Sequence, residues 1–226
     1  MDYNTLTGSV TTAGSIANWL NSGQLQSAAP TIVTEAEAII YRKLRHWRML
    51  VENTTLNTAT NVEYVALPDT GNSFLEMKSL YITGVNFKKL TMKTEQEVKA
   101  AYSYDGNGNR EQAQPSIYYV AVIAIGGSQV PCAKFDTVPD QVYPLETVFY
   151  QQPVTIATAL TNWLTNLYPR LLRCALMAQA SEFMKDAGVG NYDRTYWEQS
   201  TLAELQMAQE ESDRAMRATE VGMMLV

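Results

Sequence analysis

The sequence predicts an α+β protein that is mainly helical, namely a helical bundle with a β-rich insert and an extended C-terminal helical arm. Three observations lead to this fold class. Apolar residues recur three and four positions apart near both ends of the chain, as they do on the buried face of a helix. Between residues 53 and 152 the pattern changes mostly to an alternation of two, which is typical of strands. Beyond Met207 the helical pattern loses its apolar face.

These changes of pattern set the expected domain boundaries. Residues 1–52 and 153–208 are expected to form a discontinuous helical core, and residues 53–152 the β-rich insert. Residues 209–226 are expected to form the C-terminal arm. A chain of 226 residues is long enough for one large domain or for a core domain with an insert, at roughly 100–200 residues per domain.

Two helices are expected before the insert. The first is short and ends at Gly23. The second begins at Pro30, whose missing N–H suits a first helical turn, and Thr34 followed by Glu37 fits a capping box. The apolar face of this second helix consists of Ala36, Ile39, Ile40, Leu44, Trp47 and Leu50. Its other sides carry Arg42, Lys43, Arg45, His46 and Arg48.

The insert is expected to hold a sheet and one short helix. Strands are expected at residues 62–67, 79–83, 117–125 and 147–150, with one more after Pro131. Gly126 and Gly127 form a hairpin turn. Because proline cannot donate its backbone N–H, the strand that contains Pro131 is expected to be an edge strand or a bulged one. Thr94, followed by Glu97, caps the short helix.

The broadest apolar stripe follows the insert, and we expect the bundle to form around it. Its members are Leu164, Leu167, Tyr168, Leu171, Leu172, Ala175, Leu176, Ala180, Phe183 and Met184. A proline suits the first turn of a helix, so a short helix should end near Leu167 and a long one should begin at Pro169. Gly188 and Gly190 should end the long helix, and a last helix follows.

Composition argues against several classes of protein. No apolar run reaches the ~18 residues of a membrane span, and residues 1–10 lack a signal-peptide pattern, so we expect a protein that stays in the cytoplasm where it is made. A formal net charge of −6 argues against a dedicated nucleic-acid binder, which usually carries a basic excess. Cys132 and Cys174 form no Cys-x-x-Cys motif and are expected to be reduced and buried.

No catalytic, cofactor-binding or metal site is expected. Residues 105–109 read Asp-Gly-Asn-Gly-Asn, as in a calcium loop, but Arg110 and Ser116 stand where such a loop needs Gly and Glu. We therefore interpret this stretch as a surface loop. His46 is the one histidine, and no Ser or Cys nucleophile motif lies near it in the sequence.

Arg42 and Arg45 are the first candidates for an interface. Their spacing puts them on one helix face, opposite Leu44 and Trp47. We expect them to contact a neighbouring chain and not the core of their own. Two other interpretations stay open: a solvated face with internal ion pairs, and a contact with DNA passing close by.

The end of the chain is the second candidate. An apolar plug follows the polar part of the last helix and consists of Val221, Met223, Met224, Leu225 and Val226. Inserted in a groove, each large side chain would contribute roughly 1.5–3 kcal/mol, and methionine adapts to irregular pockets. We expect the arm to leave its own subunit and dock on a partner. The alternative is a frayed end without a function.

Several short motifs follow one another along the chain. They are Ile16-Ala-Asn-Trp-Leu20, Glu35-Ala-Glu37, Arg42-x-Leu-Arg45, Tyr64-x-x-Leu-Pro68, Tyr150-x-x-Pro153, Asn162-Trp-Leu164 and Tyr168-Pro169, with Leu176 and Ala180 on the core helix. In this order they resemble the head–tail connector proteins, or adaptors, of tailed bacteriophages, over nearly the whole chain. Ser22, Gln24 and Gln26 depart from the family, which often has Arg or Asp there, and residues 93–110 match no pattern of the family.

The resemblance implies a structural virion protein without enzymatic activity, assembled in the host cytoplasm and located at the head–tail junction. It implies a homo-oligomeric ring of about twelve copies beneath the portal. Such a ring extends the DNA channel and gives tail or nozzle proteins a docking platform, and the portal becomes the expected partner of the arm. DNA would pass through a slightly acidic lumen without sequence-specific binding, because few phosphates are neutralised.

Two functions from other classes remain as alternatives. The first is a sequence-independent DNA-handling protein of the packaging apparatus, which would use the basic residues from Arg42 to Arg48. The second is a small hydrolase.

Overall fold

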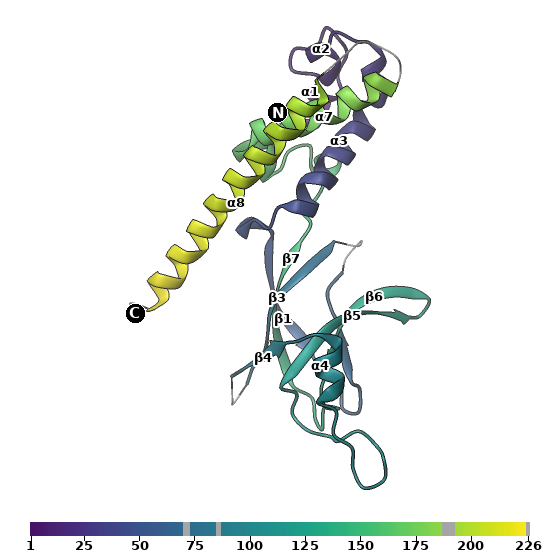
Figure 1. The fold of residues 1–226 in the computed structure, drawn as a ribbon, viewed down its shortest axis with the longest axis vertical. Coiled ribbons are helices and arrows are strands. Elements are labelled where there is room, and N and C mark those ends of the chain that lie inside the picture. The colour runs from purple at the N-terminus through teal and green to yellow at the C-terminus, as the bar shows by residue number, and fades with distance from the viewer. Residues whose placement is uncertain (70–72, 85–86, 187–192, 225–226) are drawn as a thin grey trace. The chain divides into compact units, whose positions relative to one another are not determined.

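The computed structural model describes residues 1–69, 73–84, 87–186 and 193–224 (Figure 1). The chain divides into two compact units. Met1–Arg48 and Pro153–Val226 form one of them, which we call the helical unit. Met49–Gln152 forms the other, the sheet unit.

The helical unit is built on three long helices, α3 (Gln24–Lys43), α7 (Pro169–Asp186) and α8 (Arg194–Met224). Helix α7 packs against both α3 and α8 (Figure 1). The shorter helices are α1 (Tyr3–Leu6), α2 (Ile16–Trp19), α5 (Ile156–Ala159) and α6 (Trp163–Leu167).

Most of the apolar stripe that the sequence predicts is buried, but its predicted members Leu167 and Phe183 are exposed, at 51% and 37%. The buried apolar side chains of helix α7 are Leu171, Leu172, Cys174, Ala175, Leu176, Met177, Ala178, Ala180 and Met184. Each large side chain buried in this way stabilises the fold by roughly 1.5–3 kcal/mol. The predicted division is confirmed, because α6 ends at Leu167 and α7 begins at Pro169. The predicted stop signals Gly188 and Gly190 lie outside the described residues.

Helix α3 begins earlier than the sequence predicts. It starts at Gln24 and carries Pro30 in its interior, so the predicted start at Pro30 is wrong. The added turns bury Leu25 and Ala29, and this burial offsets the backbone hydrogen bond that a proline removes. Pro30 itself lies on the exposed side of the helix. Water can therefore reach the carbonyl four residues before it, to which a proline cannot donate a hydrogen bond.

The predicted capping box at Thr34 and the continuation of α3 to Leu50 are also wrong. The Thr34 hydroxyl donates back to the Pro30 carbonyl at 3.0 Å. The helix ends at Lys43, Leu44 adopts an extended backbone, and a 3₁₀ turn, η1 (Trp47–Met49), leads into the sheet unit. Leu50 is therefore the first residue of a strand and not part of the buried face of a helix.

The sheet unit contains one seven-stranded sheet with the strand order β1-β7-β3-β4-β5-β6-β2. The strands are β1 (Leu50–Asn57), β2 (Tyr64–Ala66), β3 (Phe74–Ile82), β4 (Lys88–Met92), β5 (Ile117–Ile125), β6 (Ser128–Phe135) and β7 (Pro144–Gln151). Among the described strands, β4 and β5 pair in parallel and the other neighbours are antiparallel. The short helix α4 (Glu95–Ala100) connects β4 towards β5.

This sheet corrects the predicted fold class. The protein is not a mainly helical bundle, because helix makes up 43% and strand 26% of the structure and the sheet curves as a half-barrel. The sheet buries a hydrophobic core of its own, whose largest members include Leu80, Ile82, Leu90, Tyr118, Phe135, Leu145 and Phe149. The predicted insert, residues 53–152, thus folds around a hydrophobic core of its own. Short alternating segments in a sequence do not reveal such a core.

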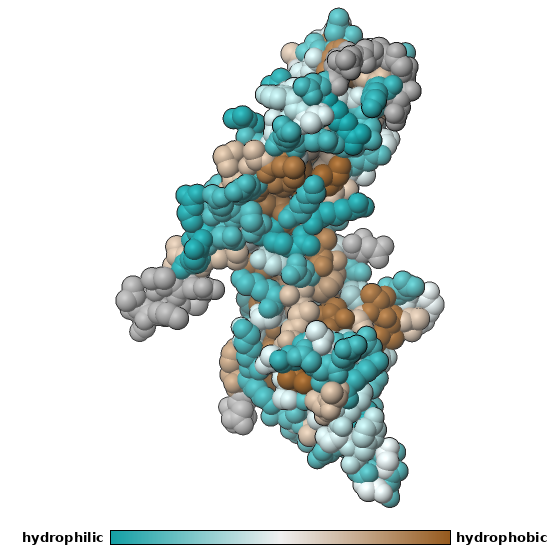
Figure 2. All heavy atoms as spheres, in the orientation of Figure 1, coloured by the Kyte–Doolittle hydropathy of each residue, from teal (hydrophilic) through white to brown (hydrophobic). Residues whose placement is uncertain are grey.

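Local signals within the sheet unit have mixed outcomes. The capping box of Thr94 and Glu97 is confirmed, and so is the hairpin turn at Gly126 and Gly127, whose positive φ angles of 58° and 85° suit glycine. The expectation for Pro131 is wrong, because β6 lies between β5 and β2 in the sheet. Proline is tolerated there since β2 pairs only with residues 132–134, so no ladder bond needs its N–H. Apolar atoms reach the surface over the β5–β6 hairpin (Figure 2).

Candidate interaction surfaces

Helix α8 holds the segment that follows α3. The Gln209 side chain accepts the Arg45 N–H at 3.0 Å and donates to the Arg45 carbonyl at 3.2 Å. The Ser212 hydroxyl, which is fully buried, accepts the Trp47 N–H at 2.8 Å. The side-chain amide of Gln209 and the hydroxyl of Ser212 thus satisfy backbone groups that no helix or strand pairs. Helix α8 therefore belongs to its own helical unit at least as far as Ser212.

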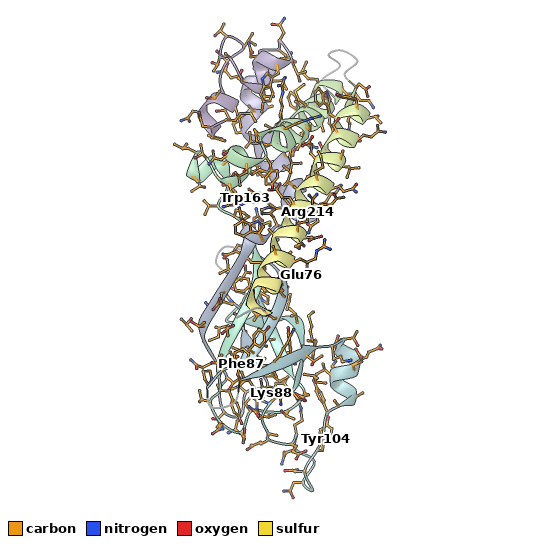
Figure 3. All side chains as sticks on the ribbon, turned by 90° about the vertical axis from the view of Figure 1, so that its left-hand side faces the viewer. Glu76, Phe87, Lys88, Tyr104, Trp163 and Arg214 are labelled. Carbon is orange, nitrogen blue, oxygen red and sulfur yellow. The ribbon has the colours of Figure 1, made fainter. Side chains whose placement is uncertain are left out.

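His46 lies in the same segment and is 1% exposed. Its ring stacks on Trp163, with 4.8 Å between centroids and 13° between planes (Figure 3 labels Trp163). Its Nδ1 accepts the Arg48 N–H at 3.3 Å, so the ring proton sits on Nε2, which donates to the Tyr168 hydroxyl at 3.1 Å. Tyr168 in turn donates to the Glu211 carboxylate at 2.9 Å.

Electrostatic effects favour the neutral forms of His46 and Tyr168 in this chain of hydrogen bonds. Burial lowers the pKa of His46, and the Arg48 charge lowers it further against the opposing effect of Glu211. Burial and the hydrogen bond to Glu211 raise the pKa of Tyr168 to about 12. The neutral imidazole, with both nitrogens bonded, thus connects Trp163 of α6 with Tyr168, which follows α6, and through Tyr168 with Glu211 of α8.

We expect the helical unit to lose stability as the pH falls below the ordinary histidine value of 6.5. A lowered pKa in the folded state means that the unfolded chain binds the proton first, so the stabilisation is complete above 6.5 and is lost on acidification. Urea denaturation at pH 7.5 and pH 5.5 measures the loss. His46→Phe keeps an aromatic ring on Trp163 but has no titrating group. In this variant the free energies of unfolding at the two pH values should differ less than in the wild type. An equal pH dependence in both proteins would contradict this role.

The other chemical candidates do not form a site. The Asp105 carboxylate accepts the N–H groups of Asn107 and Asn109 at 2.8 and 2.9 Å, so it closes its own turn. This turn lies between Tyr104 and Arg110, which form an isolated antiparallel bridge (Figure 3 labels Tyr104). Cys132 and Cys174 are both buried and unpaired with each other. Within the described part of the chain, no group of three metal-ligating side chains comes together.

Arg42 and Arg45 have different surroundings. The Arg45 guanidinium donates to the carbonyls of Tyr41, Arg42 and Leu44 at 3.0, 3.3 and 3.1 Å, and so it caps the end of α3 within its own chain. Because α3 ends at Lys43, the two arginines do not share a helix face, which corrects that part of the expectation.

The Arg42 side chain is exposed in a groove between α3, α7 and α8. The groove is lined by Ile39, Arg42, Lys43, Ala175, Ala178, Gln179, Glu182, Arg194, Glu198, Thr201 and Leu202. Arg194 pairs with both acidic residues of the groove, Glu182 at 2.7 Å and Glu198 at 2.6 Å. Arg42 and Lys43 have no carboxylate partner among the described residues, so the open cations of this groove favour an acidic occupant.

The predicted plug residues belong mostly to the last turns of α8. The α8 backbone continues to Met224, which includes Val221 and Met223, but side chains beyond residue 218 are not described. Leu225 and Val226 lie outside the described residues. Between Ser212 and residue 218 the helix is half-buried or exposed, and Arg214 points into solvent with its side chain 75% exposed (Figure 3).

Comparisons with known proteins show the family of this chain. No curated protein matches the chain. In the described ranges, no helix combines the length and apolar character needed to cross a membrane. The family model described as SU10 adaptor protein matches residues 6–222, which takes in both the helical unit and the sheet unit. The chain belongs to the SU10 adaptor protein family and is a phage adaptor protein.

Proposed function

We propose that the protein is a structural subunit of the virion that forms a ring of about twelve copies beneath the portal, extends the DNA channel and docks the tail. The observation that carries this proposal is the match of the SU10 adaptor family to residues 6–222. A net charge of −6 supports passage of DNA through the ring without tight binding, because few phosphates would be neutralised.

Negative-stain electron microscopy of the purified protein, with and without portal, tests the ring. We expect closed rings of one size, either from the protein alone or on the portal. A protein that stays monomeric under both conditions would overturn the proposal.

The exposed cations of α3 support a second candidate, sequence-independent DNA handling. Arg42 and Lys43 are exposed, and Arg48 lies over the Trp47 ring with 4.5 Å between the guanidinium carbon and the ring centroid. A DNA-handling protein would lose affinity for duplex DNA steeply as salt rises, whereas an adaptor would bind weakly at every salt concentration.

We also propose that the C-terminal part of α8 is an arm that docks on the portal. The sequence places the start of this arm at residue 209, but Gln209 and Ser212 bind their own subunit, so we now place its start after Asp213. From there on, a polar helix with little to bury leads to the apolar plug Val221, Met223, Met224, Leu225 and Val226.

Deleting residues 219–226 should abolish attachment to portal-bearing heads and leave the melting temperature of the subunit unchanged. The reason is that the deleted residues lie beyond Gln209 and Ser212, the side chains through which α8 holds the segment after α3. Thermal unfolding and co-sedimentation with heads measure the two effects. A longer deletion, from residue 209, is the matched control and should lower the melting temperature, because it removes Gln209 and Ser212. Normal attachment of the shorter variant would refute the arm.

A further inference from the structure

Strand β5 continues well beyond its neighbour β4. The two strands pair only through Thr91 with Ile117 and Met92 with Tyr118, after which the chain leaves β4 and enters α4. On its other side β5 pairs with β6 without interruption, from Tyr118 opposite Phe135 to Ile125 opposite Ser128. The end of the β5–β6 hairpin is therefore a ribbon of two strands that projects from the sheet (Figure 1).

The register shows which backbone groups face the open side of β5. Ile125 and Ser128 flank the two-residue turn and form a hydrogen-bonded pair, so every second residue from Ile125 backwards bonds to β6. The intervening residues Val120, Val122 and Ala124 direct their N–H and C=O groups away from β6. The last bond on that side runs from the Lys93 N–H to the Tyr118 carbonyl, at 2.9 Å. No described backbone group bonds to the three residues beyond it.

The side chains of this ribbon leave the core step by step. Tyr118 is buried, Val120 is half-buried, and Val122, on the same face, is 64% exposed. No charged residue occurs from residue 117 to 133. The resulting apolar patch is visible over the β5–β6 hairpin (Figure 2).

This edge lacks most of the devices that keep strand edges apart. Proteins usually protect an exposed edge with a charge, a proline, a bulge or a covering helix; β5 has no charge, proline or bulge, although the short helix α4 contacts it. An isolated apolar ribbon is also marginally stable in water. A row of free N–H and C=O groups beside the exposed Val122 is what an added strand recognises.

A groove lies where a longer β4 would pair with β5. It is lined by Met92, Lys93, Thr94, Glu95, Glu97, Tyr119, Val120 and Ala121. Lys93 and Glu97 pair with each other at 3.3 Å, so their charges are already satisfied. The groove therefore has space for a strand, and that strand does not need charged side chains to pair with Lys93 or Glu97.

We propose that the open edge of β5 pairs with β1 of a second copy of this chain. Strand β1 has eight residues and is an edge strand of the sheet, while the other edge strand, β2, has only three. Because β1 carries Glu52 and a register shift between Asn53 and Leu56, its regular segment for pairing is Leu50–Asn53. Within one chain β7, β3 and β4 separate β1 from β5, so the two cannot pair with each other. Both strands belong to the sheet unit, so the assignment does not depend on where the helical unit lies.

A contact between two different edges has a consequence for assembly. Each copy offers one β5 edge and one β1 edge, so every copy binds one neighbour on each side. Such a head-to-tail contact generates a closed ring when the rotation between copies closes. The inference rests on the ring of the proposed function and assigns the strands that join its subunits.

Val122→Lys tests the pairing. A lysine on an open strand edge blocks the approach of another strand, and position 122 already faces solvent, so the fold should be kept. The matched control is Val142→Lys, at a valine of the same unit that is 59% exposed and outside β5. Analytical ultracentrifugation should show that Val122→Lys weakens assembly at least about tenfold relative to the wild type and to Val142→Lys. Equal melting temperatures of the three proteins confirm the fold.

Hydrogen exchange in the assembled wild type supplies a readout that does not depend on a variant. The amides of Val120, Val122 and Ala124 should be protected in the ring and exchange freely in the monomer, and amides of residues 50–57 should gain protection with them. Rings that form from Val122→Lys, with these amides still exchanging freely, would overturn the inference and leave the ring intact. Protection that needs the portal, or that spares residues 50–57, would overturn the assignment to β1 of a second copy. A wild type that never assembles would overturn the proposed ring as well.

Discussion

Replacing Glu37 with Ala should lower the free energy of unfolding of the helical unit by about 3 kcal/mol. The Glu37 carboxylate is 1% exposed, yet it lies at the centre of a polar network inside the bundle. Both of its oxygens accept the Ile156 N–H at 3.1 Å, and one accepts the Tyr41 hydroxyl at 3.2 Å and the Asn162 amide at 3.3 Å.

The size of this effect follows from what the substitution leaves behind. Burial raises the pKa of Glu37, while the donors from Ile156, Tyr41 and Asn162 act in the opposite direction. Without the carboxylate, the Ile156 N–H at the start of α5 has no acceptor, and an unpaired buried donor costs about 1–3 kcal/mol. The bonds from Tyr41 and Asn162, made to an ionisable group, are lost at the same time. Glu37 thus connects α3 with the start of α5, the segment in which the chain re-enters the helical unit after the sheet unit.

Urea denaturation followed by circular dichroism measures the effect, and Glu35→Ala is the matched control. Glu35 lies on the same helix and is exposed, so its replacement should change the free energy of unfolding by less than about 0.5 kcal/mol. Glu37→Gln keeps one oxygen acceptor but adds an amide donor. Its loss of unfolding free energy should lie between the losses of Glu35→Ala and Glu37→Ala. A loss in Glu37→Ala as small as in Glu35→Ala would show that the network does not stabilise the bundle.

Glu37 also shows where sequence reasoning succeeds and where it stops. A helix such as α7 can be predicted because its apolar stripe and its initial proline are local signals, and the capping box of Thr94 is local as well. Glu37 looks like half of a capping box with Thr34, but its partner Ile156 is 119 residues away in the sequence. Only the folded chain brings the two together.

The same limit explains the error in the fold class. Short alternating segments read as a minor insert, because strand pairing such as that of β1 with β7 joins residues about a hundred positions apart. The interface candidates follow this rule too. Arg42 is exposed as expected, whereas Arg45 was assigned to a helix face that ends two residues before it. The apolar run of residues 117–125 predicted the strand β5, but the sequence did not reveal that one edge of this strand is open.

A second large effect is expected in the sheet unit, at Arg110. This residue ends the stretch 93–110, for which the sequence suggested no role, and the structure shows what its side chain contacts. Its guanidinium pairs with Glu63 and donates to the carbonyls of Phe135 and Asp136 at 2.8 and 2.7 Å. It also lies over the Tyr102 ring, with 3.7 Å between the guanidinium carbon and the ring centroid.

Arg110→Ala should therefore destabilise the sheet unit by about 2–3 kcal/mol, because hydrogen bonds of a charged group are lost and one carboxylate loses a partner. Burial alone would raise the pKa of Glu63, but Lys134 and Arg110 hold it below the usual value. A lowered pKa stabilises the fold above the ordinary glutamate value of 4.5 and ceases to do so as the pH falls below it. The free energies of unfolding of the wild type and of Arg110→Ala should accordingly differ less at pH 3.5 than at pH 7.

Urea denaturation at the two pH values checks both statements, and Lys99→Ala provides the control. Lys99 forms an exposed ion pair with Glu95 on α4 at 2.6 Å, and an exposed pair of this kind contributes little to stability. Arg110→Lys keeps the charge but cannot reach Glu63 and two carbonyls with one planar fork, so it should recover only part of the loss. If Arg110→Ala were as stable as Lys99→Ala at pH 7, the loop would be held by its own turn at Asp105 and not by this arginine.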